Sequence, residues 1–354
     1  MIKNLTYVIG LMSGTSLDGI DLVYVCFNTD DYKDFEIIHA KTYEYSDVWC
    51  NKLRRDIHQS EQDIKVLDIE YGVFLGETIN TFINEFTIEN VDFVASHGHT
   101  VFHQPEKGYT LQIGDGQQIA NITKLEVIYD FRTQDVEFGG QGAPLVPVGD
   151  ELLFSEYDYC LNLGGFANVS FKKGNERIAF DICAVNIVLN KLTQELGFAY
   201  DDKGELARSG DYLLALGEEL KQIPFYKKQP PKSLGLEWVE EEIFPKLFDT
   251  PKKAKDLLRT FTEHTAWAIA KTFPKKASVF ITGGGVFNVY LLERIKYYKE
   301  LNIIIPDKKM IEFKEALIFA FLGLLKKRGE VNCLQSVTGA NKDHSSGKVF
   351  TPNN

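Results

Sequence analysis

The sequence lacks long hydrophobic runs and an excess of positive charge. Its longest apolar run, residues 316–325, has ten residues, about half of the ~20 that a membrane-spanning helix needs, so we expect a buried helix there. The formal net charge of −11 disfavours a nucleic-acid partner, because phosphate backbones attract basic surfaces. The first residues lack the basic flank, apolar segment and cleavage site of a signal peptide. These absences predict a cytoplasmic protein with no membrane or nucleic-acid partner.

The cysteines are few and form no paired motif. Their odd number and the lack of C-x-x-C spacing indicate neither a disulfide framework nor a zinc site: Cys26, Cys50, Cys160, Cys183 and Cys333. This pattern also agrees with a cytoplasmic location.

The length and composition predict a two-domain globular protein. At roughly 150 residues per domain, 354 residues suggest about two domains, and the 44% hydrophobic and 12% aromatic content is ordinary for such proteins. Residues 130–147 are rich in glycine and proline, so we place the domain crossing there. We expect an N-terminal α/β domain over 1–130, a C-terminal α/β domain over 131–354, and a loosely ordered tail over 341–354.

Residues 10–21, GLMSGTSLDGID, lie between two apolar stretches and predict a strand, a polar turn and a second strand. Gly10, Gly14 and Gly19 would let backbone N–H groups approach a ligand, while Asp18 and Asp21 offer carboxylates. Such a turn suits a phosphate with its metal. An ordinary hairpin turn has the same composition for conformational reasons, so the residues alone leave both interpretations open.

The second half of the chain begins in the same way. Residues 159–168, YCLNLGGFAN, predict a strand that enters a Gly-Gly turn, as a duplicated nucleotide-binding domain would. Further along, a buried strand over 279–282 enters Gly283-Gly284-Gly285 and a helix follows over 289–299. Backbone dipoles at such a turn favour a phosphate or nucleotide, although a tight turn alone also accounts for the glycines. The strand over 91–96 ends at His97, and the last helix is expected over 313–328.

Several motifs together resemble the anhydro-N-acetylmuramic acid kinase family. They span nearly the whole chain: GLMSGTSLDGID (10–21), DFR (130–132), GGQGAPLVP (139–147), NLGGFAN (162–168), PPKSLG (230–235), TGGGVFN (282–288) and VTGA (337–340). The resemblance implies the α/β fold shared by actin, sugar kinases and heat-shock chaperone ATPases, with two related domains and ATP in the cleft between them. It also raises the expectation of a homodimer.

The resemblance implies an ATP-dependent kinase that needs Mg²⁺. Water would add at the anomeric carbon of 1,6-anhydro-N-acetylmuramic acid, the internal ether would open, and the 6-oxygen would take the γ-phosphoryl group. The products would be N-acetylmuramic acid 6-phosphate and ADP, in peptidoglycan recycling and amino-sugar catabolism.

The resemblance also assigns site residues. Asp181, expected to close a strand over 178–180, would be the general base and contact the sugar, with a turn or helix-cap aspartate as the alternative. Arg132 would bind sugar or phosphate, unless it forms an interdomain salt bridge. His97 and Glu315 would also bind the sugar, although Glu315 could instead be a first-turn helix glutamate. His97, His99 and His103 are not expected to form a zinc site, which needs three correctly disposed ligands.

The nucleotide site implied by the family is made of the opening loop and the Gly-rich turns of the second half. The opening loop would hold the ATP phosphates, with Asp18 placing Mg²⁺, and the glycines of the second half would face the nucleotide. The expected ATP-binding residues are Gly14, Thr15, Ser16, Leu17, Asp18, Gly19, Ile20, Asp21, Gly164, Gly165, Gly283, Gly284, Gly285 and Asn288.

One segment departs from the family pattern. After the catalytic aspartate the family usually has Thr-Gly-Pro-Gly-Asn, whereas this chain has Ile-Cys-Ala-Val-Asn over 182–186, which adds side chains where backbone should approach phosphate. A catalytically silent sugar or nucleotide sensor on the same fold is therefore an alternative, as is a kinase for another sugar. A polyphosphate hydrolase is disfavoured, because the acidic chain shows no basic track.

Overall fold

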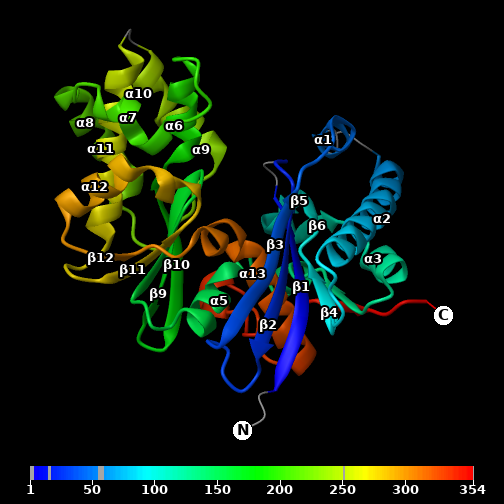
Figure 1. The fold of residues 1–354 in the computed structure, drawn as a ribbon. Coiled ribbons are helices and arrows are strands. Elements are labelled where there is room, and N and C mark those ends of the chain that lie inside the picture. Colours follow the sequence, from blue (N-terminus) through cyan, green and yellow to red (C-terminus); the bar gives the residue numbers. More distant parts are fainter. Residues whose placement is uncertain (1–3, 15–16, 55–59, 250–251, 354) are drawn as a thin grey trace. The chain divides into compact units, whose positions relative to one another are not determined.

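The computed structural model describes residues 4–14, 17–54, 60–249 and 252–353. The chain divides into two compact units, of which unit 1 comprises Met1–Phe154 and Phe313–Asn354, and unit 2 comprises Ser155–Glu312 (Figure 1). This division differs from the boundary expected at 130/131, because the Gly/Pro-rich segment and the end of the chain both fold with the N-terminal sheet. Among the described residues, none of the helices has the length and apolar character needed to cross a membrane.

Unit 1 is built on a six-stranded sheet in the order β13-β7-β4-β1-β2-β3. β1 pairs antiparallel with β2 and β2 with β3, whereas β1, β4 and β7 run parallel. A separate hairpin is formed by β5 and β6. The strands are β1 (Leu5–Ser13), β2 (Ile20–Asn28), β3 (Phe35–Tyr43), β4 (Phe93–Ser96), β5 (His99–Gln104), β6 (Tyr109–Ile113), β7 (Val127–Tyr129) and β13 (Lys348–Phe350).

Helices cover both faces of this sheet. Ile9 and Leu11 of β1 join a buried cluster with the apolar side of α2, while the opposite face of β1 meets α13 at Gly10. The helices of unit 1 are α1 (Asp47–Arg54), α2 (Glu61–Glu85), the 3-10 turn η2 (Pro105–Lys107), α3 (Gly116–Thr123), α4 (Thr133–Glu137), α5 (Val146–Leu153), α13 (Lys308–Arg328), whose first five residues belong to unit 2, and α14 (Gln335–Thr338).

Gly10 therefore has a packing role and lies inside a strand, not in the ligand-facing turn in which the sequence placed it. A Cβ at this position would lie 2.3 Å from the Ala316 carbonyl oxygen and 2.7 Å from the Ala320 Cβ. We expect Gly10→Ala to lower the free energy of unfolding by about 1–3 kcal/mol, because overpacking forces the helix away from the sheet. Urea denaturation measures this loss, and an unchanged midpoint would contradict the packing assignment.

The end of the chain is part of unit 1. β13 pairs antiparallel with β7, and Cys333 and His344 form an isolated antiparallel bridge. The expectation of a loosely ordered tail over 341–354 is therefore wrong for residues 341–350. Sequence reasoning missed the strand β13 because a three-residue edge strand has almost no periodic hydrophobic pattern.

Unit 2 contains a five-stranded sheet in the order β10-β9-β8-β11-β12. Its core lies between the apolar face of that sheet and the helices α6, α11 and α12. The strands are β8 (Tyr159–Leu163), β9 (Phe166–Lys173), β10 (Glu176–Ala184), β11 (Ser278–Thr282) and β12 (Asn302–Ile304). The helices and 3-10 turns are α6 (Asn186–Gln194), η3 (Asp202–Gly204), α7 (Glu205–Arg208), α8 (Leu214–Lys221), η4 (Pro224–Lys227), α9 (Leu236–Glu242), α10 (Phe244–Phe248), α11 (Ala254–Thr272), η5 (Gly284–Phe287) and α12 (Val289–Tyr298).

The two sheets share one topology. In unit 1 the order β3-β2-β1-β4-β7, and in unit 2 the order β10-β9-β8-β11-β12, both place an antiparallel meander beside two strands parallel to its first strand. Two related α/β halves, each opening with a hairpin, are therefore confirmed. In both halves the carboxyl ends of the parallel strands meet at one edge, where ligands bind in sheets of this type.

Candidate active site

In unit 1, the carboxyl ends of β1, β4 and β7 bring together residues that are far apart in the sequence. His97 follows β4 and its backbone N–H donates to the Leu11 carbonyl at 3.0 Å, while the Ser13 hydroxyl donates to the Gly98 carbonyl at 2.7 Å. Arg132 follows β7 in the turn before α4. The sequence-predicted residues His97 and Arg132 therefore lie side by side.

Arg132 is held in a fixed orientation by His97. Its Nε and Nη2 atoms donate to His97 Nε2 at 3.1 and 2.9 Å, and its Nη1 donates to the Gly142 carbonyl at 2.6 Å. Because Nε2 accepts, the single proton of the neutral ring is on Nδ1. Burial, and then the nearby guanidinium, hold the pKa of His97 well below its usual range. These hydrogen bonds lie within unit 1, which gives no support to the interdomain salt bridge.

Glu315, on α13, acts electrostatically on Arg132. Burial lowers the pKa of Arg132 to about 10, and the Glu315 carboxylate works in the opposite direction by favouring the charged guanidinium. Arg132 therefore stays protonated at neutral pH. α13 begins at Lys308, so Glu315 lies beyond the first turn and the helix-dipole interpretation is wrong. The helix start was misplaced because a charged stretch precedes the apolar run.

The other two histidines have separate surroundings. His99 begins β5, where its ring lies edge-on to Tyr71, and burial lowers its pKa to about 4. His103 Nδ1 lies 3.2 Å from the Thr110 hydroxyl oxygen.

The loop between β1 and β2 is only partly as expected. Thr15 and Ser16 lie outside the described residues, and Leu17 takes a positive φ of 60°. The side chain of Asp18 is exposed, so its carboxylate is accessible to a cation. Gly19 is required for another reason, because a Cβ there would lie 2.8 Å from the Tyr43 carbonyl oxygen.

Two residues of this motif already belong to the sheet. Ile20 is fully buried at the start of β2, so only its backbone could serve a ligand. Asp21 accepts a hydrogen bond of 2.5 Å from the Thr42 hydroxyl on β3.

Unit 2 carries a polar row across its sheet. Asp181 on β10 pairs in register with Asn168 on β9, and Asn168 pairs with Asn162 on β8. Residues opposite each other in register point to the same face, and this face is the one opposite the apolar cluster of Leu161 and Val169. Sequence reasoning assigns no role to the two asparagines of the motif NLGGFAN, although their positions near strand ends could have indicated one.

Asp181 lies within β10, three residues before its end, next to a bulge. The expectation that Asp181 closes its strand is therefore wrong, and so is the alternative that it caps a helix. Its Oδ2 accepts from the Leu234 N–H at 2.8 Å, and its own N–H donates to the Lys232 carbonyl at 3.1 Å, so the PPKSLG segment holds it. Burial raises the pKa of Asp181, and the Leu234 N–H partly opposes this rise.

Residues 182–185, where the chain departs from the family pattern, have their side chains in the core. All four are at most 3% exposed, so they do not cover the surface of the loop. The backbone N–H groups that follow are already used, because Val185 and Ile187 donate to the Gly165 carbonyl at 2.8 and 3.3 Å and Asn186 donates to that of Gly164 at 3.3 Å. Gly164 and Gly165 thus serve the start of α6 through their carbonyl groups.

The triple glycine follows β11, whose end pairs in parallel with Asn162. A Cβ on Gly283, at φ 85°, would lie 2.7 Å from the Leu163 carbonyl oxygen, and one on Gly285 would lie 2.7 Å from the Leu163 Cβ. Gly284 differs, because a Cβ there has no atom within 4 Å. Its backbone is therefore the accessible part of the turn. The Asn288 side chain caps α12 by accepting from the Leu291 N–H at 2.9 Å.

This difference between the glycines can be tested. We expect Gly284→Val to leave the melting temperature unchanged and to raise the KM for ATP about tenfold, a loss of ~1.4 kcal/mol, because the new side chain occupies the open space over the turn. Gly283→Ala is the matched control and should lower the melting temperature, because alanine is strained at positive φ. An unchanged KM for ATP in a folded Gly284→Val protein would remove Gly284 from the nucleotide site.

Comparisons with known proteins agree along the whole chain. Residues 6–352 match the family model described as anhydro-N-acetylmuramic acid kinase. A protein of that name from Bacillus cereus (strain AH187) is 33% identical over 383 residues, covering 98% of this chain and 99% of that protein. Another of that name from Francisella tularensis subsp. novicida (strain U112) is 30% identical over 373 residues, covering 97% and 98%.

A solved structure was also matched, component A of (R)-2-hydroxyglutaryl-CoA dehydratase from Acidaminococcus fermentans, at 12% identity, with a TM-score of 0.47 and coverage of 89% of this chain and 96% of that one. The full-length match to the family model and the identity to its members lead to one conclusion. This chain is a kinase that belongs to the anhydro-N-acetylmuramic acid kinase family.

Proposed function

We propose that this chain uses ATP to phosphorylate 1,6-anhydro-N-acetylmuramic acid while water opens the anhydro ring, giving N-acetylmuramic acid 6-phosphate and ADP. Water adds at the anomeric carbon, the bond from that carbon to the 6-oxygen breaks, and the 6-oxygen takes the γ-phosphoryl group. The reaction would serve peptidoglycan recycling and amino-sugar catabolism. The observation that carries the proposal is the polar strand row of unit 2 that presents Asp181.

Asp181 would take the proton from the attacking water. The Leu234 N–H donates a hydrogen bond to Asp181 Oδ2. Because no donor to Oδ1 is found among the described residues, Oδ1 is left to accept the proton. Burial raises the pKa of Asp181, and a base whose pKa lies nearer the working pH is the more effective one. Asn168 and Asn162, in the same row, offer amide groups for the hydroxyl groups of a sugar.

Arg132 would bind an acidic oxygen of the sugar or of the transferred phosphoryl group. Its guanidinium is a planar fork of donors that His97 and the Gly142 carbonyl hold in place. Because that orientation exists before a ligand arrives, less conformational entropy is lost on binding. The Glu315 carboxylate favours the charged form of the guanidinium and offers an acceptor for a sugar hydroxyl.

Each unit, taken by itself, offers a group that suits a nucleotide or its metal. Gly284 exposes backbone at the strand edge of unit 2, and Asp18 exposes a carboxylate, the kind of oxygen ligand that Mg²⁺ takes. When bound, ATP would supply the phosphoryl group and Mg²⁺ would neutralise charge on its oxygens.

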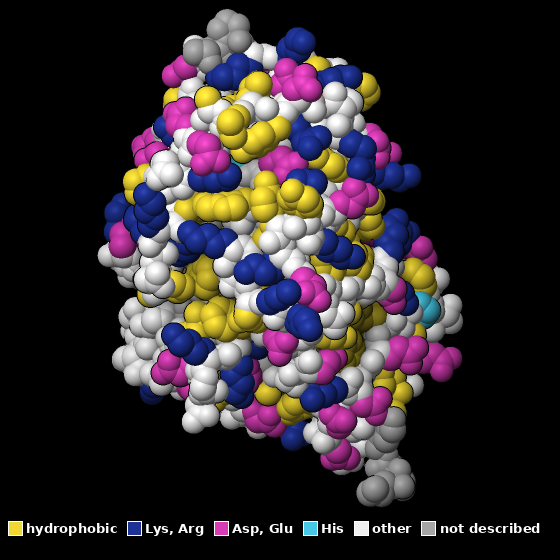
Figure 2. Space-filling model, turned by 90° about the vertical axis from the view of Figure 1, so that its left-hand side faces the viewer, with side chains coloured by type: hydrophobic (Ala, Val, Ile, Leu, Met, Phe, Trp, Pro, Cys, Tyr) yellow, Lys and Arg dark blue, Asp and Glu magenta, His cyan; other side chains and the backbone are white. Residues whose placement is uncertain are grey.

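A catalytically silent sensor is the second candidate function. It is favoured by one observation, the use of the backbone N–H groups of residues 185–187 within the loop itself, which makes them unavailable to a phosphate in this conformation. A polyphosphate hydrolase gains no such support from the face drawn in Figure 2, where lysine and arginine side chains are interspersed with acidic ones, because long polyanions need a continuous basic surface.

An ADP-release assay with purified protein and Mg-ATP distinguishes these functions. We expect ADP with the anhydro-sugar and none above background with N-acetylglucosamine or other amino sugars. ADP release with a different sugar would indicate a related kinase, and sugar binding without ADP release would indicate a sensor. Either of these results would overturn the proposal.

A further inference from the structure

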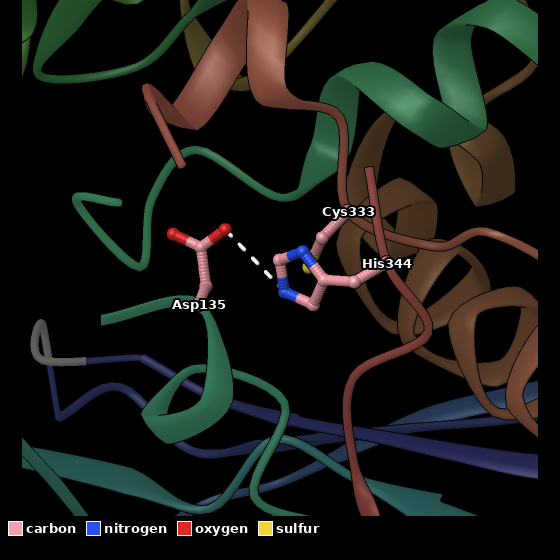
Figure 3. Close-up of side chains that lie close together, drawn as sticks. All are labelled: Asp135, Cys333 and His344. Carbon is pink, nitrogen blue, oxygen red and sulfur yellow. Dashed lines mark ion pairs between the residues drawn. The ribbon is translucent and has the colours of Figure 1, made fainter. Parts of the chain in front are cut away.

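Three side chains with metal-ligand chemistry lie together inside unit 1. The ligand atoms of Asp135, Cys333 and His344 all lie within 4.8 Å of one another, and all three residues are buried. Figure 3 shows the carboxylate on α4 facing the imidazole and the sulfur from the C-terminal segment. Cys333 and His344 are held opposite each other by two backbone hydrogen bonds of 3.0 and 3.1 Å, so the fold keeps the two residues next to each other.

The imidazole of His344 is oriented with a free lone pair toward the cluster. Its Nδ1 lies 3.1 Å from the Lys342 carbonyl oxygen, and since a carbonyl only accepts, Nδ1 carries a proton. Its Nε2 is buried, has no hydrogen-bond partner among the described residues, and lies 3.5 Å from Asp135 Oδ1. This contact is an ion pair when the ring is protonated; in the neutral ring, two electron-rich atoms face each other unless a metal cation lies between them. Histidines that bind metals commonly donate their other ring N–H to a backbone carbonyl in this way.

Asp135 is prepared to act as a ligand. Its side chain is fully buried, and within the described part of the chain two uncharged groups donate hydrogen bonds to it: the Gly142 N–H to Oδ2 at 2.7 Å and the Thr338 hydroxyl to Oδ1 at 2.7 Å. Burial of a carboxylate is costly unless it is paired or binds a metal. The motifs GGQGAPLVP and VTGA, to which sequence reasoning gave no chemical role, supply these donors and orient the carboxylate.

We propose that Asp135, Cys333 and His344 bind a divalent cation of the zinc class. A set of one sulfur, one nitrogen and one oxygen suits Zn²⁺ or Co²⁺, whereas Mg²⁺ and Ca²⁺ prefer oxygen alone. Ligand atoms of a tetrahedral zinc ion are ~3.5 Å apart, so small rotations of the Cys333 and His344 side chains complete the site. A water molecule can take the fourth position.

The cation would fasten the C-terminal segment to α4. Asp135 is three residues after Arg132, and Cys333 and His344 flank the segment that contains α14. This role is independent of the Mg²⁺ that accompanies ATP. Spacing rules applied to the sequence could not find the site, because Asp135 is far from the other two ligands in the chain.

Cobalt titration of the chelator-treated, reduced full-length protein tests this site. We expect binding of a single equivalent of Co²⁺, with an absorption band from charge transfer between thiolate and Co²⁺, and a higher melting temperature in Zn²⁺. Cys333→Ser should abolish the band. Cys160→Ser is the matched control and should keep it, since Cys160 is also 2% exposed but lies in unit 2.

Three results would overturn the proposal: no stoichiometric Co²⁺ binding by the unaltered protein, a charge-transfer band that survives Cys333→Ser, or a band lost in Cys160→Ser. Should Cys333→Ser fail to fold by circular dichroism, His344→Gln replaces it. That variant keeps the thiol and should bind Co²⁺ at least tenfold more weakly, about the loss expected for one ligand or its support, and unchanged affinity would contradict the site.

Discussion

Asp181→Asn should lower kcat with the anhydro-sugar by about 10²–10⁴, the usual contribution of a positioned general base. The amide oxygen can still accept the Leu234 N–H, so the loop over 230–235 should stay in place. We therefore expect the melting temperature and the KM for ATP to change little. Steady-state ADP release at saturating sugar measures the effect, and a loss of tenfold or less would remove Asp181 from the role of base.

Asp201→Asn provides a matched control in the same unit. Asp201 is a buried carboxylate that, like Asp181, accepts hydrogen bonds from backbone N–H groups, here those of Leu206 and Ala207 at 2.8 and 2.9 Å. This variant should affect stability but leave kcat unchanged. In the unaltered enzyme, kcat/KM should fall as the pH falls through the pKa of Asp181, which burial places above 3.8. That acid limb should disappear in Asp181→Asn.

Arg132→Met should lower kcat/KM for the sugar by about 10–10², since hydrogen bonds to charged groups are worth about 1.5–3 kcal/mol. Methionine approximates the length of the side chain but removes every donor. Arg132→Lys should recover only part of the loss, because an ammonium group cannot reproduce the planar fork that contacts His97 and the Gly142 carbonyl.

Arg208→Met is the control for this change. Arg208 forms an exposed pair with Glu293 at 2.7 Å, and surface pairs contribute little, so kcat/KM should stay the same. Kinetics at varied sugar concentration, together with melting curves, separate binding from folding. A folded Arg132→Met enzyme with unchanged kcat/KM would show that Arg132 does not contact the substrate.

Sequence reasoning located several strand ends and their turns correctly, because an apolar strand followed by a Gly-rich or polar turn is a local pattern. It placed His97 after β4, a glycine pair after β8, a triple glycine after β11, and two related halves in the chain, all of which the structure contains. The roles of these residues in binding and catalysis remain predictions.

The parts that could not be predicted depend on contacts between distant segments. The sequence suggests that Gly10 is a turn glycine, and only the structure shows that α13 packs against it. The sequence likewise suggests that residues 182–185 obstruct a phosphate, and only the structure shows that their side chains lie in the core. The domain boundary was misplaced because no local signal shows that the C-terminal segment returns to unit 1. Asp135, Cys333 and His344 meet only because of that return.

The most direct test of the central claim, that water opens the sugar ring as the phosphoryl group is transferred, is the reaction in water labelled with heavy oxygen. Mass spectrometry of the sugar phosphate should show one heavy oxygen on the anomeric carbon, an unlabelled phosphoryl group on the 6-oxygen, and ADP in equal amount. A phosphorylated product that still contains the anhydro ring, or label found in free inorganic phosphate, would contradict the account.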